Sequence, residues 1–511
     1  MRVFGSVVDV RLTLVASSLA LLLVTGCMVG PNYRTPETKM PDQWRQAATA
    51  GMAEGRANLQ TWWTVFDDPT LTDLIQRSGV GNLGLQDAVY RVQQARAQRG
   101  IATGELFPTL GGNVDYTRAS VSHVSRGNTS LSPVGLTNAG FDSTWEIDVF
   151  GGIRRNIESA TAILQASVEQ YRDVMVTLYA EIGLNYADVR TLQERLAFAR
   201  DNVDRQRQTL DLVKSRFQNG LVPQLDVRQA ESNLANSESQ IPSFQAGMVQ
   251  AIDRLSVLLG KEPACLQDEL SRPGPIPKTS AQVTLDMPLD LLRQRPDVRE
   301  AERTLAAASA QIGVTTADLY PHFSLSGTYA AAGTQAFGVS VWPWAWSFGP
   351  AMRWDIFDGV RNVYRVRAAQ AVTGQSRALY EQTVLSAMNE VEDAIVGYAQ
   401  EQIRRDALLR AVVAQREAVD LVQDLYKNGL TDFQNVLDTE RFLFQQEDQL
   451  AVSEGLVTKD LISLYKALGG GWSPETPLVA PAFGQDGLTG QTNATGSAEA
   501  ATQPASQPAK E

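Results

Sequence analysis

Few residues of this 511-residue chain have side chains that could carry out chemistry. There are two cysteines, Cys27 and Cys265, and two histidines, His123 and His322, and the members of each pair are about 200 residues or more apart. Disulfide frameworks and thiolate metal sites need several cysteines, and isolated histidines on strands are more often solvent-facing than metal ligands. The sequence also lacks a phosphate-binding loop and a GxSxG nucleophile motif. We therefore expect no enzyme, no catalytic residue, no cofactor and no metal site.

Cys27 is the residue for which the sequence predicts a covalent modification. It follows an apolar run, residues 12–24, that is preceded by Arg2 and Arg11 and is too short for a spanning helix. This pattern is typical of a signal peptide, and the segment VTGC (24–27) resembles a bacterial lipobox. An ordinary signal peptide with an incidental cysteine is the alternative. We predict that residues 1–26 are removed and that Cys27 carries a lipid. Met28 rather than Asp follows the cysteine, which resembles lipoproteins sent to the outer membrane.

The composition restricts how the chain meets a membrane and which partners it has. No other run of 18 consecutive apolar residues occurs, so we expect no membrane-spanning helix, and a crossing would need a closed β-barrel. The formal net charge of −12 argues against nucleic acid as a partner. An acidic chain suits a lumen that favours cations, although a solvated acidic surface fits equally well.

Large apolar residues occupy alternate positions between residues 341 and 359, and the residues between them are small or polar. Because successive side chains leave a strand on opposite faces, this period of two predicts a β-strand. Such a strand either packs its aromatic face on the core of a sandwich or spans a membrane with tryptophans at the headgroup level. The alternating apolar residues are Trp342, Trp344, Trp346, Phe348, Met352, Trp354 and Ile356.

The same alternation occurs in two other segments, 141–149 and 322–333. The first places Trp145 and Phe141 opposite Asp142 and Glu146, and the second places apolar and polar residues on opposite faces in the same way. Each half of the chain therefore offers two strands of about 10 to 15 residues, long enough to cross a bilayer when tilted. Four strands cannot close a barrel, for which about eight is the practical minimum, so several chains must combine their strands.

The chain contains two similar halves. The segment DLVKSRFQNGL (211–221) and the segment DLVQDLYKNGL (420–430) are identical at six of eleven positions. Each half predicts a helix that stops at Pro108 or Pro321, two strands, a very long helix, a tight turn and a second long helix. The fold class is therefore mainly α with a membrane β-barrel part. A helix of roughly 60 residues is about 90 Å long, longer than one globular domain needs.

The turns between the long helices have strong signals. Asn219-Gly220 and Asn428-Gly429 predict left-handed caps, each followed by an apolar residue, Leu221 or Leu430. Thr431 and Gln434 predict a capping box at the start of the last helix. Heptad spacing before each turn predicts left-handed coiled-coil pairing. The residues at this spacing are Val203, Gln206, Leu210, Val213 and Phe217 in the first half, and Val412, Gln415, Val419, Val422 and Tyr426 in the second.

The expected organisation follows from these segments. A signal peptide (1–26) precedes a lipidated N-terminal segment (27–82), and the first repeat covers residues 83–260. A linker (261–295) leads to the second repeat (296–469) and a C-terminal segment (470–482). Residues 483–511 are rich in Gly, Ala, Thr, Gln and Pro, which predicts a disordered tail.

With these features the chain resembles the TolC-like outer membrane factors, in particular the lipoprotein branch of OprM and NodT type that serves tripartite RND efflux systems. The resemblance covers about residues 25–472 and does not reach the tail. Four segments carry it: TGCMVGPNYRTP (25–36), WWTVFDDPTLTDLI (62–75), RPDVREAERTLAAASAQIGVTTADLYP (295–321) and YKNGLTDFQNVLDTERFLF (426–444).

The resemblance implies a homotrimer in the outer membrane, with a twelve-stranded β-barrel and a helical tunnel through the periplasm. It also implies that the segments outside the repeats (27–82, 261–295 and 470–482) form an equatorial region. The tryptophans Trp145, Trp342, Trp344, Trp346 and Trp354 would form an aromatic girdle at the membrane lipid. The partners it implies are a periplasmic adaptor protein and an inner-membrane RND-type pump. The adaptor would contact the hairpin tips at Asn219, Gly220, Leu221, Asn428, Gly429 and Leu430.

The resemblance further implies a periplasmic gate of aspartates at the hairpin tips. Asp438 matches a gate position, while Asn435 stands where some members have a second aspartate. Asp226, Asp432 and Tyr426 are the other expected gate residues, although the two aspartates also suit the positive ends of helix dipoles. The function it implies is a passive exit duct for small molecules. An exit duct for type I protein secretion and a non-transporting lipoprotein scaffold are the alternatives.

Overall fold

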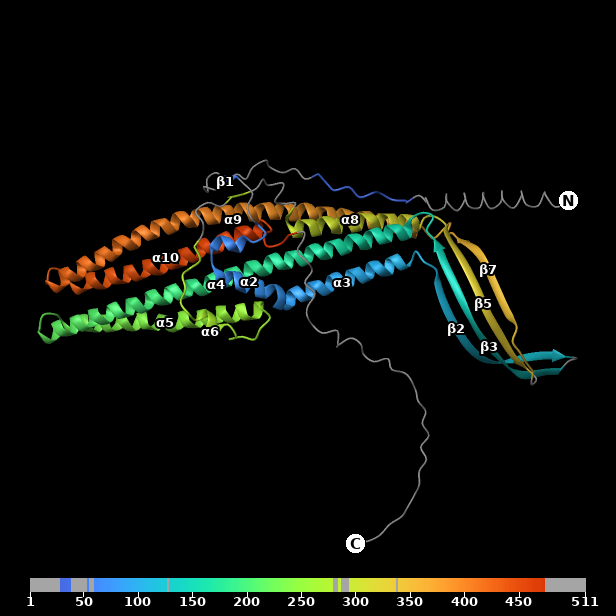
Figure 1. The fold of residues 1–511 in the computed structure, drawn as a ribbon, viewed down its shortest axis with the longest axis horizontal. Helices are drawn as coiled ribbons and strands as arrows, with labels where there is room; N and C mark the ends of the chain where they lie inside the picture. Colours follow the sequence, from blue (N-terminus) through green and yellow to red (C-terminus); the bar gives the residue numbers. More distant parts are fainter. Residues whose placement is uncertain are drawn as a thin grey trace, which may run out of the picture.

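The structure of the chain is a computed structural model that describes residues 28–37, 53–54, 59–125, 128–278, 284–285, 294–336 and 339–473. The expected signal peptide, the lipid-bearing Cys27 and the expected C-terminal tail lie outside these residues. Most of the described chain is helical, and the long helices run side by side with a β-sheet at one end (Figure 1).

The elements of the two halves follow the same order, as the sequence predicted. The first half consists of α3 (Leu83–Gly104), β2 (Thr109–Ser125), β3 (Asn128–Ile147), α4 (Gly152–Gln218) and α5 (Gln224–Leu258). The second half consists of α8 (Pro296–Ala317), β5 (His322–Ala336), β6 (Val339–Val341), β7 (Trp344–Arg353), α9 (Arg361–Lys427) and α10 (Phe433–Ala467). Short elements precede or connect the halves: β1 (Ala53–Glu54), η1 (Trp62–Phe66), α2 (Pro69–Gly81), α6 (Gln267–Leu270) and β4 (Thr284–Leu285).

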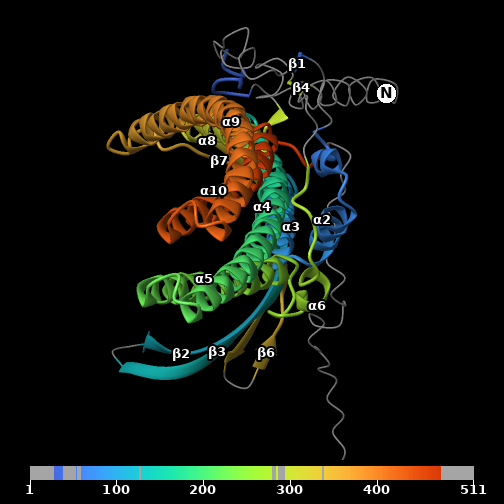
Figure 2. The same cartoon turned by 90° about the vertical axis from the view of Figure 1, so that its left-hand side faces the viewer.

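The helices α4 and α9 have 67 residues each, so each is about 100 Å long. Their hairpins with α5 and α10 turn at the end of the molecule opposite the sheet (Figure 1). Along the long axis, α9, α10, α4 and α5 follow an arc (Figure 2), in which α10 packs on α9 and α4, and α4 packs on α5. The helices α5 and α9 therefore form the two ends of the arc.

The strands of the two halves form one antiparallel sheet in the order β2, β3, β5, β7, and the short β6 also pairs with β5, while β1 and β4 form a separate parallel pair. The register places Phe141, Tyr329 and Trp346 side by side on one face. The adjacent row, which includes Asp142 and Thr328, lies on the other face. This arrangement confirms the predicted alternation of an aromatic and a polar face.

The segment around Trp342 differs from the prediction of one continuous strand. The fourth strand is interrupted at Trp342 and Pro343, which lie between β6 and β7. Proline has no backbone N–H to donate to the ladder, but its carbonyl oxygen still accepts a hydrogen bond from the Ala332 N–H at 3.1 Å. The Trp342 ring lies against Gly333, where a Cβ atom would come within 2.9 Å of it.

The main hydrophobic core lies midway along the helices, where η1 and α2 pack on α4 and α10. Trp62 is almost fully buried, stacks on Tyr465 with ring centroids 5.7 Å apart and contacts Trp63 edge to face. Asp68 caps α2 by accepting the Thr70 and Leu71 N–H groups. Among the helices in the described ranges, none combines the length and the apolar character needed to cross a membrane.

Candidate functional site at the hairpin tips

Each hairpin tip is shaped by a glycine with positive φ. Gly220 has a φ of 73° and Gly429 a φ of 74°, a backbone conformation that residues with a Cβ atom rarely adopt. The N–H groups of Leu221 and Leu430 donate to carbonyl groups five residues earlier, both at 2.9 Å, which closes the α4 and α9 helices. The predicted left-handed caps are therefore confirmed.

The apolar residues after these glycines do not fold back on the helices. Leu221 is 65% exposed and Leu430 is 73% exposed, so each tip presents a bare leucine. Asn219 and Asn428 each donate from the side-chain amide to a carbonyl oxygen four residues earlier, at 2.7 and 2.8 Å. The tips are thus rigid in the backbone and apolar at the end.

The predicted capping box at the start of α10 is wrong. Asp432 occupies the N-cap position and its side chain makes no capping hydrogen bond. Thr431 Oγ1 instead accepts from Asn435 Nδ2 at 2.9 Å, and Gln434 Nε2 donates to both carboxylate oxygens of Asp438, at 3.1 and 3.0 Å. A carboxylate one helical turn away is the stronger acceptor for the Gln434 amide, so this amide does not reach back to the backbone.

A small hydrophobic cluster joins the two hairpins just behind the tips. Tyr426 of α9 is 2% exposed, and its ring centroid lies 5.6 Å from that of Phe433 of α10. The cluster includes residues of all four long helices, so opening the hairpins would separate packed side chains. Its other buried members are Leu210, Val213, Val227, Ala230, Val436 and Leu437.

Arg216 of α4 links the first hairpin to the end of α9. Its guanidinium lies 4.6 Å from the centroid of the Tyr426 ring and donates to the carbonyl oxygens of Tyr426 and Lys427. A cation at these carbonyls also suits the negative end of the α9 dipole. Sequence reasoning missed Arg216. The signal that could have found it is a break in the repeat, since the matching residue is Leu425.

The two repeats differ at the last heptad position. Val203, Leu210 and Val213 are buried as predicted, and Gln206 is also buried. Phe217, however, is 41% exposed, although its repeat partner Tyr426 is buried between the hairpins. Arg216, next to Phe217 on α4, covers the Tyr426 ring, and this contact has no counterpart in the other hairpin.

The expected gate aspartates do not form a single cluster within one chain. Asp226 lies in the first turn of α5, and burial together with the nearby Asp432 raises its pKa above the usual value. Asp438 lies six residues beyond Asp432, about 9 Å along α10, and is half exposed. Arg441 comes within 4.0 Å of it, so in one chain its charge is partly compensated.

Behind the tips lies a row of buried polar side chains that sequence reasoning also missed. Glu447 of α10 is 1% exposed and is bonded by Arg205 of α4 at 2.9 Å and Arg416 of α9 at 2.8 Å. Two turns closer to the tip, Glu440 is 3% exposed and has no such cation at hydrogen-bond distance. The sequence alone does not distinguish these buried carboxylates from exposed ones, because their burial depends on which helices pack together.

At the other end of the helices, tryptophans fasten the sheet to the helical part. Trp145 Nε1 donates to the carbonyl oxygen of Leu106 at 2.9 Å, and Trp354 Nε1 donates to that of Leu319 at 3.2 Å. These two tryptophans occupy equivalent positions in the two repeats. The side chains of Trp342, Trp344 and Trp346 are exposed in the single chain, as those of Trp145 and Trp354 also are.

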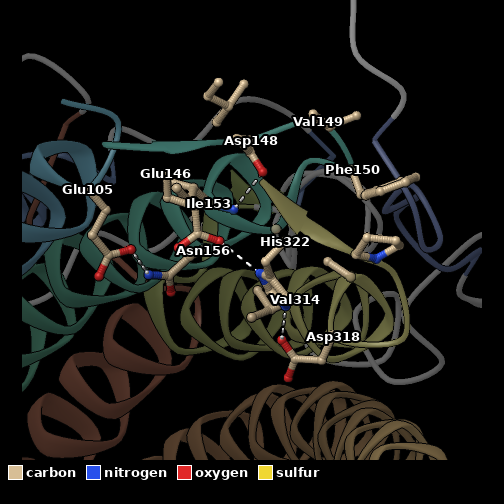
Figure 3. A pocket seen from close by; sticks show the side chains of 14 residues that line it. Glu105, Glu146, Asp148, Val149, Phe150, Ile153, Asn156, Val314, Asp318 and His322 are labelled. Carbon is tan, nitrogen blue, oxygen red and sulfur yellow. Dashed lines mark hydrogen bonds and ion pairs between the residues drawn. The ribbon is translucent and has the colours of Figure 1, made fainter. Parts of the chain in front are cut away.

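A cavity of about 240 Å³ lies at the junction of sheet and helices (Figure 3). His322 Nδ1 lies 2.8 Å from Glu146 Oε1, and its Nε2 lies 4.0 Å from Asp318. Asp148 accepts from the backbone N–H of Ile153 at the start of α4. These polar groups bind one another or cap a helix, so they connect the sheet to the helices at this cavity.

Known proteins resemble this chain along most of its length. It matches the family model described as outer membrane efflux protein over residues 74–261 and 287–470. It is 32% identical over 465 residues to nodulation protein T of Rhizobium leguminosarum bv. trifolii, which covers 91% of this chain and 98% of that protein. It is 29% identical over 475 residues to outer membrane protein OprJ of Pseudomonas aeruginosa, with 91% and 97% covered.

Solved structures give the same result. The chain superimposes on a structure of the outer-membrane channel OprN with a TM-score of 0.80 and 34% identity, covering 87% of this chain and 100% of that one. It superimposes on a structure of CusC with a TM-score of 0.74 and 27% identity, again covering 87% and 100%.

Replacing Tyr426 by alanine should loosen the contact between the two hairpins. The change removes a buried ring and the surface on which Arg216 lies. Replacing a core aromatic residue by alanine lowers the free energy of unfolding by about 3 to 5 kcal/mol. Hydrogen exchange at the ends of α4 and α9 should become faster. Tyr426→Phe is the control: the buried hydroxyl has no hydrogen-bond partner, so this variant should exchange like the wild type. Equal exchange in Tyr426→Ala and wild type would contradict the role of the cluster.

Proposed function

Because this chain belongs to the outer membrane efflux protein family and is the outer membrane exit duct of a tripartite efflux pump, we propose that three copies of it build that duct. Each copy would supply four strands to a twelve-stranded barrel and its long helices to a tunnel in the periplasm. The observation that carries the proposal is the two-faced sheet, with an aromatic and a polar face, at one end of helices about 100 Å long.

The edges of the single chain support the assembly. The strands β2 and β7 lie at the two edges of the sheet, and among the described residues no other strand pairs with their outer sides. A lipid-exposed edge would leave backbone N–H and C=O groups without partners, each at a cost of several kcal/mol. The helices α5 and α9 at the ends of the arc carry exposed apolar residues, including Leu225, Val249, Leu379 and Leu421.

Native mass spectrometry of the detergent-solubilised protein should therefore show a trimer that survives mild denaturation. A closed barrel protects its backbone hydrogen bonds, whereas a lone chain leaves two strand edges open. Circular dichroism of the same sample reports its strand content. A dominant monomer with full strand content would contradict the shared barrel.

The N-terminal residues support the proposed lipid anchor at Cys27. The Val29 N–H donates to the Phe150 carbonyl oxygen at 3.1 Å, and the buried Arg155 donates to Val29 O at 3.1 Å and to Asn32 Oδ1 at 2.8 Å. Met28 packs against Gly151, where a Cβ atom would come within 2.7 Å of it. These contacts hold the residue after Cys27 where the sheet meets α4, beside the membrane that the sheet would cross.

We expect mass spectrometry of the mature protein to find the lipid on Cys27, because this residue directly follows the predicted signal peptide (1–26) and precedes this docked segment. Cys27→Ala should leave an uncleaved precursor or a protein without lipid, and Cys265→Ala is the matched control, since Cys265 is exposed and free. An unmodified Cys27 in the mature wild type would refute the anchor. A mature protein found only in the inner membrane would refute its destination.

The hairpin tips are the proposed periplasmic gate and the surface for the adaptor protein. Three copies of Asp438 around one axis, with Asp432, Asp226 and Tyr426 near the tips, would form a constriction that attracts cations. The rigid tips with exposed Leu221 and Leu430 would contact the adaptor, and an inner-membrane RND-type pump would supply the energy. Opening would separate the hairpins at the Tyr426 cluster.

In this proposal the pump sets the substrate class, and the duct conducts passively. Relatives are named as a solvent efflux protein of Pseudomonas putida and a cation efflux protein of Escherichia coli. Such different substrates fit a passive duct, and we propose small-molecule efflux for this chain as well. Export of a protein cargo by the reconstituted system would contradict small-molecule efflux and favour type I protein secretion instead.

Replacing Asp438 by alanine should reduce the cation selectivity of the duct and its block by multivalent cations. The change removes three negative charges from the constriction, where they act at short range on a passing ion. Planar-bilayer recordings with asymmetric salt measure both quantities. Asp211→Ala, which removes an exposed aspartate of α4, is the control and should leave both unchanged. Unchanged selectivity and block in Asp438→Ala would place the constriction elsewhere.

A further inference from the structure

Glu440 is a buried carboxyl group at the contact between the two hairpins of one chain. It belongs to α10 and is 3% exposed. Its Oε1 accepts from Thr209 Oγ1 of α4 at 2.7 Å and from Gln423 Nε2 of α9 at 3.0 Å. Its Oε2 is buried and has no hydrogen-bond partner. An ionised carboxylate with an unpaired buried oxygen is costly, so the closed packing favours the protonated form.

The neighbours of Glu440 supply little positive charge. On α4 the charged group that acts on Glu440 is Arg205, and it is already bonded to Asp201 and Glu447. On α9 the contacting side chain is the neutral Gln423, while Arg416 is bonded to Glu447. On α10 itself, Arg441 donates to Asn233 of α5. Burial is the largest influence on Glu440, and it raises the pKa of this carboxyl above the usual range.

Two other glutamates show that this environment is particular to Glu440. Glu447, on the same helix, is equally buried but is bonded by two arginines from two helices. Glu231 is the repeat partner of Glu440 on α5, yet it is partly exposed and lies 2.8 Å from Arg228 and 3.8 Å from Lys214. Glu447 is therefore buried and bonded to two arginines, and Glu231 is partly exposed. Only Glu440 of these three is buried without a cation at hydrogen-bond distance.

We propose that Glu440 is a proton-sensitive switch that holds the two hairpins of each chain together when it is protonated and favours their separation when it is ionised. The proposal rests on the opening of the proposed duct at its tips. Moving α9 and α10 away from α4 would break the contact between Glu440 and Thr209 and expose the carboxyl group to water. Gln206, one turn before Thr209 on α4, also has a buried amide oxygen without a partner.

The direction of the pH effect follows from the raised pKa in the closed packing. At low pH the carboxyl is protonated in both states, so it adds no cost to closing. As pH rises through the ordinary pKa and then through the raised one, ionisation disfavours the closed packing. Each pKa unit between the closed and the open state changes their ratio by about tenfold per chain. The duct should therefore open more readily as pH rises and close in acid.

The test compares full-length wild type, Glu440→Gln and Glu231→Gln in planar bilayers from about pH 5 to about pH 8, the range across which a raised carboxyl pKa acts. Wild type should conduct several-fold more at the upper end than at the lower end. Glu440→Gln copies the protonated carboxyl, so its conductance should stay low across the range. Glu231→Gln should follow the wild type. The aspartates at the tips are the same in all three proteins, so the difference between them isolates Glu440.

Thermal unfolding of the same three proteins gives a second measurement. Glu440→Gln should match the wild type in acid and become the more stable protein as pH rises, because only the wild type then buries a charge. If Glu440→Gln keeps the pH dependence of the wild type in both measurements, the switch is refuted while the duct stands. If none of the proteins conducts, the duct is refuted, and the unfolding measurement alone still decides whether Glu440 senses protons.

Discussion

The constraint on which the rest of the structure depends is that a sheet placed in a bilayer must satisfy all of its backbone hydrogen bonds within the protein. The four strands of one chain cannot do so, because β2 and β7 leave open edges. In the proposed duct, three chains close the barrel, and the same closure brings the ends of the helical arc, α5 and α9, against neighbouring copies. In this proposal the single chain is one sector of a cylinder, and the exposed apolar side chains on its helices and sheet are surfaces that assembly and lipid would cover.

The two halves of the chain share their backbone plan but differ in the side chains that link the hairpins. The capping glycines Gly220 and Gly429 have nearly the same φ, because both tips need the same left-handed turn. Arg216 corresponds to Leu425, however, and the buried Glu440 corresponds to the exposed Glu231. The duplicated fold supplies two equivalent helical hairpins. Residues that differ between the two repeats make the contact between these hairpins asymmetric. In this chain α10 carries the buried carboxylates and α9 carries the buried Tyr426.

The sequence predicted the long helices, the strands and the glycine caps because each depends on a local period or a local backbone requirement. It did not predict the break at Pro343 within a strong period of two, or the exposure of Phe217 within a regular heptad, since both depend on neighbours elsewhere in the chain. The polar links behind the tips were beyond its reach for the same reason. Arg216 bonds residues 210 positions away, and Thr209 bonds a carboxylate 231 positions away. The spacing of residues along the chain does not predict such pairs. A residue that differs between the two repeats, such as Arg216 against Leu425, is the sequence signal that indicates where one occurs.

In a gate that a partner protein opens, the packing between the hairpins must be stable enough to keep the gate closed. It must also be weak enough for the partner's binding energy to separate them. The described contact between the hairpins has both properties. The cluster around Tyr426 and the paired Glu447 hold the helices together, whereas Glu440, Gln206 and Asn233 each bury a polar atom without a partner. Each of these atoms raises the free energy of the closed packing, because it regains hydrogen bonds to water when the helices separate. A fully apolar seam of the same length would close more firmly, and an adaptor would then need more binding energy to open it. In the proposed gate, the imperfect polar row would lower the free energy needed for opening, and the loss of one proton from Glu440 would shift the balance toward the open state.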